Sequence, residues 1–215
     1  MKKILKTVFY MLPLYCQRNI QNLIHKRELK KWIQNGRPVP PPHLIKQLTI
    51  KEYQKKYDIQ TLVETGTYLG DMIVAQLPNF IKIISIELSE ELYYRAVKRF
   101  RRCSKVNIIQ GDSGKVLHNI IHELKTPAIF WLDGHYSAGI TAKGEKNCPI
   151  YGELEAIFVS PLNHILLIDD ARCFDGSNDY PTIGELQQYF IDKNIIHSFS
   201  IKDDVIRIVL GKIDE

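Results

Sequence analysis

Short apolar segments alternate with longer amphipathic segments along most of the chain after residue 58. Runs of apolar and β-branched residues predict five strands, at 61–64, 82–87, 106–110, 128–133 and 165–169. Apolar residues at helical spacing predict helices between and after these strands, at 71–76, 89–102, 114–124, 151–159 and 182–193. Strands that alternate with helices favour a parallel sheet with helices on both faces.

The end of the chain departs from this alternation. Two further apolar segments, 196–202 and 205–210, are joined by little more than Asp203 and Asp204. A connection this short cannot carry a parallel crossover, so the two segments must form an antiparallel hairpin. The pattern therefore predicts an α/β fold, namely a doubly wound, seven-stranded, mostly parallel sheet whose last strand is antiparallel.

The first part of the chain differs from the rest in charge and in pattern. Residues 1–57 hold 13 basic and two acidic residues, a net charge of +11, whereas residues 58–215 hold 16 basic and 22 acidic residues, a net charge of −6. The run RPVPPP predicts a stiff linker, and residues 43–57 predict an amphipathic helix. We therefore expect a basic, helical N-terminal appendage with its linker at 1–42 and one main domain at 43–215.

The basic appendage indicates an anionic partner. Residues 7–16 are mostly apolar and follow three lysines, which is typical of a helix at a membrane surface; a terminal helix packed on the domain is the alternative. No run of 18 apolar residues is present, and the four scattered cysteines suit a reducing compartment. These features favour a cytoplasmic protein that contacts the inner face of a membrane through residues 1–37, and they leave the oligomeric state open.

The first predicted strand runs into a glycine-containing loop, VETGTYLGD. A dinucleotide-binding GxGxxG motif starting at Gly66 would require glycine where this chain has Tyr68 and Asp71. A pattern of one acidic residue and two glycines, Glu64, Gly66 and Gly70, fits instead. Gly66 allows a tight turn, and Gly70 allows a ligand or helix to approach closely. The loop therefore disfavours a nicotinamide-dependent oxidoreductase.

Polar residues also end the next two strands. Glu87 stands 21 residues after Gly66, where a carboxylate can accept hydrogen bonds from both ribose hydroxyls of a nucleoside. The third strand ends in residues that could face an adenine ring, namely Gln110, Gly111, Asp112 and Ser113. Asp112 or Ser113 could equally cap the helix that follows.

Together these strand ends resemble class I S-adenosylmethionine-dependent methyltransferases, over about residues 43–212. The first loop is similar to that of the catechol and caffeoyl-CoA O-methyltransferases, in which an aromatic residue commonly replaces a second glycine, as Tyr68 does here. The resemblance implies a Rossmann-like methyltransferase fold and S-adenosylmethionine as the cofactor. It also implies that the cofactor is bound by Glu64, Gly66, Thr67, Tyr68, Gly70, Glu87, Gln110, Gly111, Asp112, Ser113 and Asp133.

The fourth and fifth predicted strands end in acidic residues, Asp133 in FWLDGHYS and Asp169 and Asp170 in HILLIDDARCF. These strands are neighbours in the methyltransferase fold, so the three carboxylates are expected to converge at one edge of the cofactor pocket. A hard divalent cation usually compensates such repulsion, which predicts a Mg²⁺ site held by all three. The macrolide-sugar O-methyltransferases show a similar DG…DD arrangement. Alternatively, Asp133 and Asp169 cap loops or helices, and Asp170 pairs with Arg172.

The segment after the fourth strand supplies candidate catalytic residues beside Asp133. His135 has an ordinary pKa of about 6.5, which suits a general base, although a loop histidine can instead hold a backbone carbonyl. The catechol enzymes have a lysine three residues after the first aspartate, where this chain has Tyr136. Lys143 is therefore the second candidate, in a long loop that we expect to close over the substrate.

These residues predict an S-adenosylmethionine-dependent O-methyltransferase that transfers a methyl group directly to the hydroxyl of a small acceptor, with a saccharide as one candidate. The alternative is a noncatalytic S-adenosylmethionine-binding module that delivers its basic N-terminus to a membrane or a partner. Nucleic acid is not expected as a substrate, because the sequence has no NPPY-like tetrad.

Overall fold

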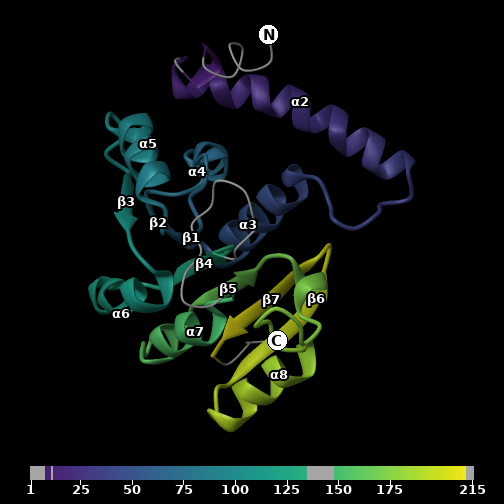
Figure 1. Ribbon diagram of the computed structural model, residues 1–215, viewed down its shortest axis with the longest axis vertical. Coiled ribbons are helices and arrows are strands. Elements are labelled where there is room, and N and C mark those ends of the chain that lie inside the picture. The colour runs from purple at the N-terminus through teal and green to yellow at the C-terminus, as the bar shows by residue number, and fades with distance from the viewer. Residues whose placement is uncertain (1–7, 11, 135–147, 212–215) are drawn as a thin grey trace.

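The computed structural model describes residues 8–10, 12–134 and 148–211, which form a seven-stranded sheet flanked by helices (Figure 1). The described helices are α2 (Leu14–Gln34), α3 (His43–Tyr57), α4 (Asp71–Gln76), α5 (Glu90–Phe100), α6 (Ser113–Glu123), α7 (Ile150–Phe158), the 3-10 helix η1 (Ala171–Cys173) and α8 (Ile183–Asp192). The strands are β1 (Thr61–Thr65), β2 (Lys82–Glu87), β3 (Val106–Gln110), β4 (Ala128–Leu132), β5 (Ile165–Ile168), β6 (His197–Lys202) and β7 (Val205–Leu210).

The strands lie in the order β3-β2-β1-β4-β5-β7-β6. Strands β1 to β5 pair with one another in parallel, whereas β7 is antiparallel to both β5 and β6. The predicted hairpin and the predicted fold class are both confirmed. The chain winds outward from β1 to β3 in one direction and from β4 to β5 in the other, so the direction of winding changes between β1 and β4.

The predicted elements agree closely with the observed ones. No predicted boundary of the main domain's strands and helices differs by more than two residues from the observed boundary. Strand β4 ends at Leu132 and β5 at Ile168, one residue earlier than expected. Asp133 and Asp169 are therefore the first residues beyond their strands, at the same edge of the sheet.

Helices cover both faces of the sheet, because successive strand residues point to opposite faces. Val63 and Phe130 pack in one core with α6, α7 and α8. Leu62 and Ile129 pack in a second core with α3, α4 and α5. The central strands β1, β4 and β5 are buried along their whole length, as expected for parallel strands that are covered on two sides.

Helix α2 lies outside the sheet and its two helical layers, across α4 and one end of α3 (Figure 1). Gln17, only 1% exposed, links α2 to α5. Its side-chain amide donates to the Leu12 carbonyl at 2.7 Å and accepts from Arg99 Nη2 at 2.6 Å. The linker after α2 folds back, since Trp32 Nε1 donates to the Pro38 carbonyl at 2.7 Å. The appendage is thus anchored to the main domain. Within the described ranges, no helix combines the length and apolar character needed to cross a bilayer.

Candidate functional site

The loops after β1 and β4 meet where the winding direction of the sheet changes. Gly66 has φ 84°, a left-handed conformation that favours glycine, and a Cβ there would lie 2.4 Å from the Asp133 carbonyl oxygen. The Asp133 backbone N–H donates to the Thr65 carbonyl at 3.2 Å. In open α/β sheets, ligands bind beyond the strand ends at this position. Gly66 therefore has the role expected of it, a turn that only glycine allows.

Glu64, near the end of β1, is hydrogen-bonded to the residues that support this loop. Its side chain is buried, with the whole residue 2% exposed, and Oε2 accepts a hydrogen bond from Ser85 Oγ at 2.6 Å. Ser85 Oγ in turn lies 2.6 Å from Thr67 Oγ1. Burial raises the pKa of Glu64 to about 8, because the carboxylate loses its hydration. Glu64 and Thr67, both predicted to bind the cofactor, thus belong to a buried chain of hydrogen bonds that holds the loop in place.

Glu87 lies at the end of β2 with its carboxylate fixed by the backbone. Oε2 accepts from the Tyr68 N–H at 2.7 Å, and Oε1 accepts from the Ser89 N–H at 2.9 Å. Burial raises the pKa of Glu87 above its ordinary value. Each oxygen has two lone pairs, so both can accept another hydrogen bond from a ligand. Tyr68 has φ 48° and is about half exposed, which places its ring at the surface of the site.

Arg99 of α5 holds the second half of the loop. Its Nη1 donates to the Leu69 carbonyl and, at 2.9 Å, to Asp71 Oδ1. Gly70, at φ 76°, immediately precedes α4, and a Cβ there would lie 2.6 Å from the Phe100 ring. The same guanidinium bonds Gln17 of α2, as described above. One buried arginine therefore connects the candidate cofactor loop to the N-terminal appendage.

The residues from the end of β3 to the start of α6 were predicted either to face an adenine ring or to cap the helix. Asp112 caps α6, since its Oδ1 accepts the Gly114 N–H at 3.0 Å, which confirms the capping interpretation for this residue. Gln110 is exposed and donates to the Leu88 carbonyl at 3.1 Å. The Gly111 N–H donates to the backbone carbonyl of Glu87 at 2.9 Å. Ser113 is the first residue of α6 and is mostly buried.

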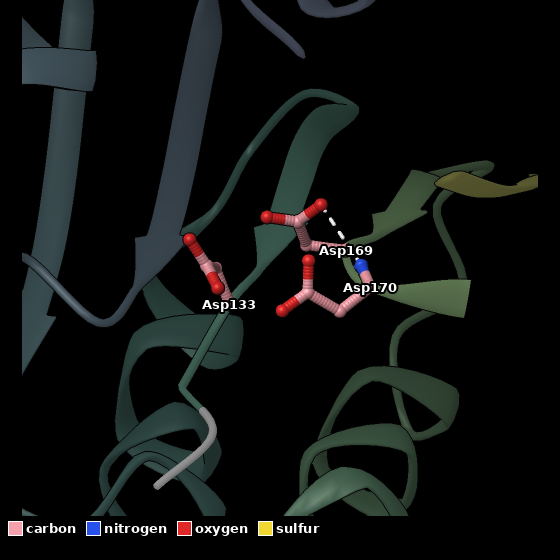
Figure 2. A group of neighbouring side chains, drawn as sticks. All are labelled: Asp133, Asp169 and Asp170. Carbon is pink, nitrogen blue, oxygen red and sulfur yellow. Dashed lines mark hydrogen bonds between the residues drawn. The ribbon is translucent and has the colours of Figure 1, made fainter. Parts of the chain in front are cut away.

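The three aspartates predicted to bind metal do converge (Figure 2). One carboxylate oxygen from each of Asp133, Asp169 and Asp170 lies within 4.8 Å of the others. The Asp170 N–H donates to Asp169 Oδ1 at 2.8 Å. Burial, and then the charge of Asp169, raises the pKa of Asp133 well above its ordinary value. Burial also raises the pKa of Asp169, to about 6, although a neighbouring cation lowers it.

That cation is Lys46 of α3. Its Nζ lies 2.5 Å from Asp169 Oδ2 and 3.1 Å from Asp170 Oδ1. Burial alone would lower the pKa of Lys46, but Asp169 and Asp170 hold it above its ordinary value. Lys46 did not figure in the sequence-based hypothesis, because nothing in the local sequence links it to residues more than a hundred positions away.

Arg172 is a second cation beside the cluster. Its Nη1 donates to Asp170 Oδ1 at 2.8 Å and also to Asp204 Oδ2. Burial would raise the pKa of Asp170, but Lys46 and Arg172 together lower it below its ordinary value. The pairing of Asp170 with Arg172, considered above as an alternative to metal binding, is therefore present. It does not exclude a metal, because four carboxylates and two cations leave a net charge of −2 when all are ionised.

Glu153 of α7 is another acidic residue that the sequence did not single out. It is fully buried, and neither carboxylate oxygen has a well-directed hydrogen bond. A Cβ on Gly134 would lie 3.2 Å from Glu153 Oε1, so this carboxylate sits directly beneath the start of the segment after β4. Burial raises its pKa to about 7, while the hydroxyls of Ser113 and Thr65 lower it. His135 and Lys143, the candidate bases in that segment, lie outside the described residues.

Comparison by sequence finds no match to a family model and none to a curated protein. Solved structures match in shape. The methyltransferase PaMTH1 from Podospora anserina, with SAH bound, is 16% identical, with a TM-score of 0.54 over 78% of this chain and 78% of that chain. An O-methyltransferase from Bacillus cereus in complex with SAH is 13% identical, with a TM-score of 0.56 over 87% of this chain and 90% of that one.

A caffeoyl-CoA O-methyltransferase-like protein from Staphylococcus aureus is also 13% identical, with a TM-score of 0.56 over 92% of this chain and all of that chain. At such low identities the likeness concerns the fold. The strand order, the terminal hairpin and these neighbours agree with one another. The chain has the Rossmann-like fold of the class I S-adenosylmethionine-dependent methyltransferases, as its strand ends predicted.

Proposed function

We propose that this protein is an S-adenosylmethionine-dependent methyltransferase that transfers a methyl group to a hydroxyl of a small acceptor such as a saccharide. One observation carries the proposal. At the point where the winding of a methyltransferase-type sheet reverses, the loop from Gly66 to Gly70 closes on the Glu87 carboxylate, which the Tyr68 N–H holds in place. A nucleoside bound at such a point would meet an acidic residue that can accept from its ribose.

The described residues fit the cofactor part by part. Glu87 can accept from the two ribose hydroxyls through the lone pairs that its backbone donors leave free. We assign contact with the adenine to Gln110, at the end of β3, and to Ser113, at the start of α6. When bound, S-adenosylmethionine supplies a methyl group attached to a positively charged sulfur. The Gly66 turn packs the loop against the Asp133 carbonyl, where a Cβ would clash.

We further propose that Mg²⁺ binds Asp133, Asp169 and Asp170. Carboxylate oxygens are the ligands that this cation prefers, and its charge of +2 balances the net charge of −2 that the surrounding groups carry when all are ionised. The Lys46 ammonium would act as the counter-ion of the cluster in the absence of metal and would have to release Asp169 when the cation binds. When bound, the cation would lower the pKa of an acceptor hydroxyl and orient its oxygen.

The chemistry is a direct displacement. The methyl group would pass from the sulfur of the bound cofactor to the acceptor oxygen as the carbon–sulfur bond breaks, which would leave S-adenosylhomocysteine, and the hydroxyl proton would pass to a base. His135 is the first candidate for that base because it follows Asp133 and Gly134 directly in the sequence, and Lys143 is the second. The protein contributes orientation and electrostatics and forms no covalent intermediate.

The test uses the full-length protein, methyl-labelled S-adenosylmethionine, Mg²⁺ and a panel of sugars and polyols. Calorimetry should show cofactor binding, and S-adenosylhomocysteine should form together with a labelled product only when an acceptor is present. The Glu87→Ala variant should lose both signals. Tight cofactor binding with no turnover on any acceptor would favour a noncatalytic binding module, and an absence of cofactor binding would refute both functions.

A further inference from the structure

Helix α2 has a polar inner face and an outer side that carries exposed aliphatic residues. Its inner face carries the buried Gln17 and Gln21 and packs on α3 and α4. On the other side, Ile20, Leu23 and Ile24 are 38%, 64% and 48% exposed. Residues three and four positions apart lie on one side of a helix, so these three aliphatic side chains form one patch. The packing of α2 on the domain does not account for this patch.

Basic residues extend the patch along the helix. Arg27, Lys30 and Lys31 are exposed and continue the same stripe one to three turns further on. We call the six side chains the outer face of α2: Ile20, Leu23, Ile24, Arg27, Lys30 and Lys31. The helix as a whole holds five basic residues and one acidic residue, a net charge of +4, within an N-terminal part whose net charge is +11.

We propose that the outer face of α2 docks on an anionic membrane surface. Aliphatic side chains beside lysine and arginine suit an interface that is apolar at acyl depth and negatively charged at the headgroups. A polyanion such as nucleic acid would pair with the basic residues but would leave the three aliphatic side chains without a partner. The helix lies flat across the domain (Figure 1), so it can meet a membrane along its length.

Docking by this face requires no folding step. The inner face of α2 is already held by Gln17, through its bonds to Leu12 and Arg99. The helix therefore presents its outer face already formed, and membrane binding does not have to offset the entropy of helix formation. The proposal does not depend on the catalytic assignment, because none of the six outer-face residues belongs to the cofactor site or the acidic site.

The experiment is co-sedimentation of the full-length protein with phosphatidylcholine vesicles, with and without phosphatidylglycerol. Two triple variants divide the outer face: one replaces Arg27, Lys30 and Lys31 with Gln, and the other replaces Ile20, Leu23 and Ile24 with Ser. Two matched controls make the same changes at exposed sites elsewhere, with Lys82, Lys98 and Lys125 replaced by Gln, and Ile81, Ile191 and Ile196 replaced by Ser. Circular dichroism verifies that each variant is folded.

The wild type should sediment with phosphatidylglycerol vesicles and release as salt is raised. Loss of three outer-face cations should weaken binding on the order of 100-fold, since each changes the affinity for an anionic surface roughly fivefold. The aliphatic variant should weaken it at least about tenfold, and both controls should bind like the wild type. No binding at low salt would overturn the proposal. So would equal losses in variants and controls, or full binding by the aliphatic variant, which would mark a general attraction to polyanions.

Discussion

Lys46 offers the most direct test of the acidic site. Replacing it with Met keeps much of the side chain's volume and removes its charge. Asp169 has a side chain only 1% exposed and Lys46 one 15% exposed, so the pair is largely shielded from water. Removing one partner of such a pair costs about 3 kcal/mol, because the other charge is left buried and unpaired. For a chain of this length that loss lowers the melting temperature by about 6–12 °C.

Thermal melts of wild type and Lys46→Met, each with and without millimolar MgCl₂, measure the effect. We expect Mg²⁺ to raise the melting temperature of Lys46→Met more than that of the wild type, because the cation no longer competes with the ammonium. Lys55→Met, on the exposed side of the same helix, is the control and should behave like the wild type. If Lys46→Met melts like the control, Lys46 does not neutralise the cluster. If Mg²⁺ leaves Lys46→Met unchanged, the cluster is not a cation site.

Three further substitutions test other parts of the structure. Glu87→Ala should weaken S-adenosylmethionine binding at least about 100-fold by calorimetry, because two hydrogen bonds to a charged group are lost; an unchanged dissociation constant would contradict the cofactor assignment. Gln17→Ala should lower the melting temperature by about 4–8 °C through loss of the acceptor for Arg99, whereas the exposed Asn19→Ala should not; equal melting temperatures would show that this contact is dispensable. The pKa of Glu153 is about 7 in the folded chain and near 4.5 in the unfolded chain. The carboxyl group therefore stays protonated to a higher pH in the folded chain, and the stability that this protonation contributes is lost as the pH rises from about 4.5 to 7. The unfolding free energy of the wild type should therefore fall between pH 5 and pH 8, and Glu153→Gln should make this fall smaller by about 3 kcal/mol. Denaturant titrations at the two pH values measure the fall. An equal fall in the variant and the wild type would contradict the prediction.

The sheet could be predicted because its determinants are local. Each strand is a short apolar run, and each connection is either a helix or a turn too short for a crossover. The meeting of Asp133 with Asp169 and Asp170 followed from that topology, since β4 pairs with β5 up to Leu132 and Ile168. Capping by Asp112 could also be foreseen, because a cap bonds a backbone N–H only two residues away.

Lys46, Arg99 and Glu153 could not be predicted in the same way. Each reaches its partner only after a helix has packed on the sheet, with a particular rotation about its own axis. The contact of Lys46 with Asp169 spans 123 positions, and no periodicity in α3 marks position 46 as different from the other lysines of that helix. The way in which α2 is anchored could not be predicted either, because nothing in the sequence indicates that Gln17 bonds Arg99.

The bond between Arg99 and Gln17 has a thermodynamic consequence. Arg99 bonds Leu69 and Asp71 at the candidate cofactor loop and Gln17 on α2, so any movement of that loop would be transmitted to the helix through one side chain. Linkage between two binding events is reciprocal. If a ligand in the loop strengthens the binding of α2 to a membrane by some factor, the membrane strengthens the binding of that ligand by the same factor. If both proposals hold, the protein would bind S-adenosylmethionine with one affinity at a membrane and with another in bulk solution.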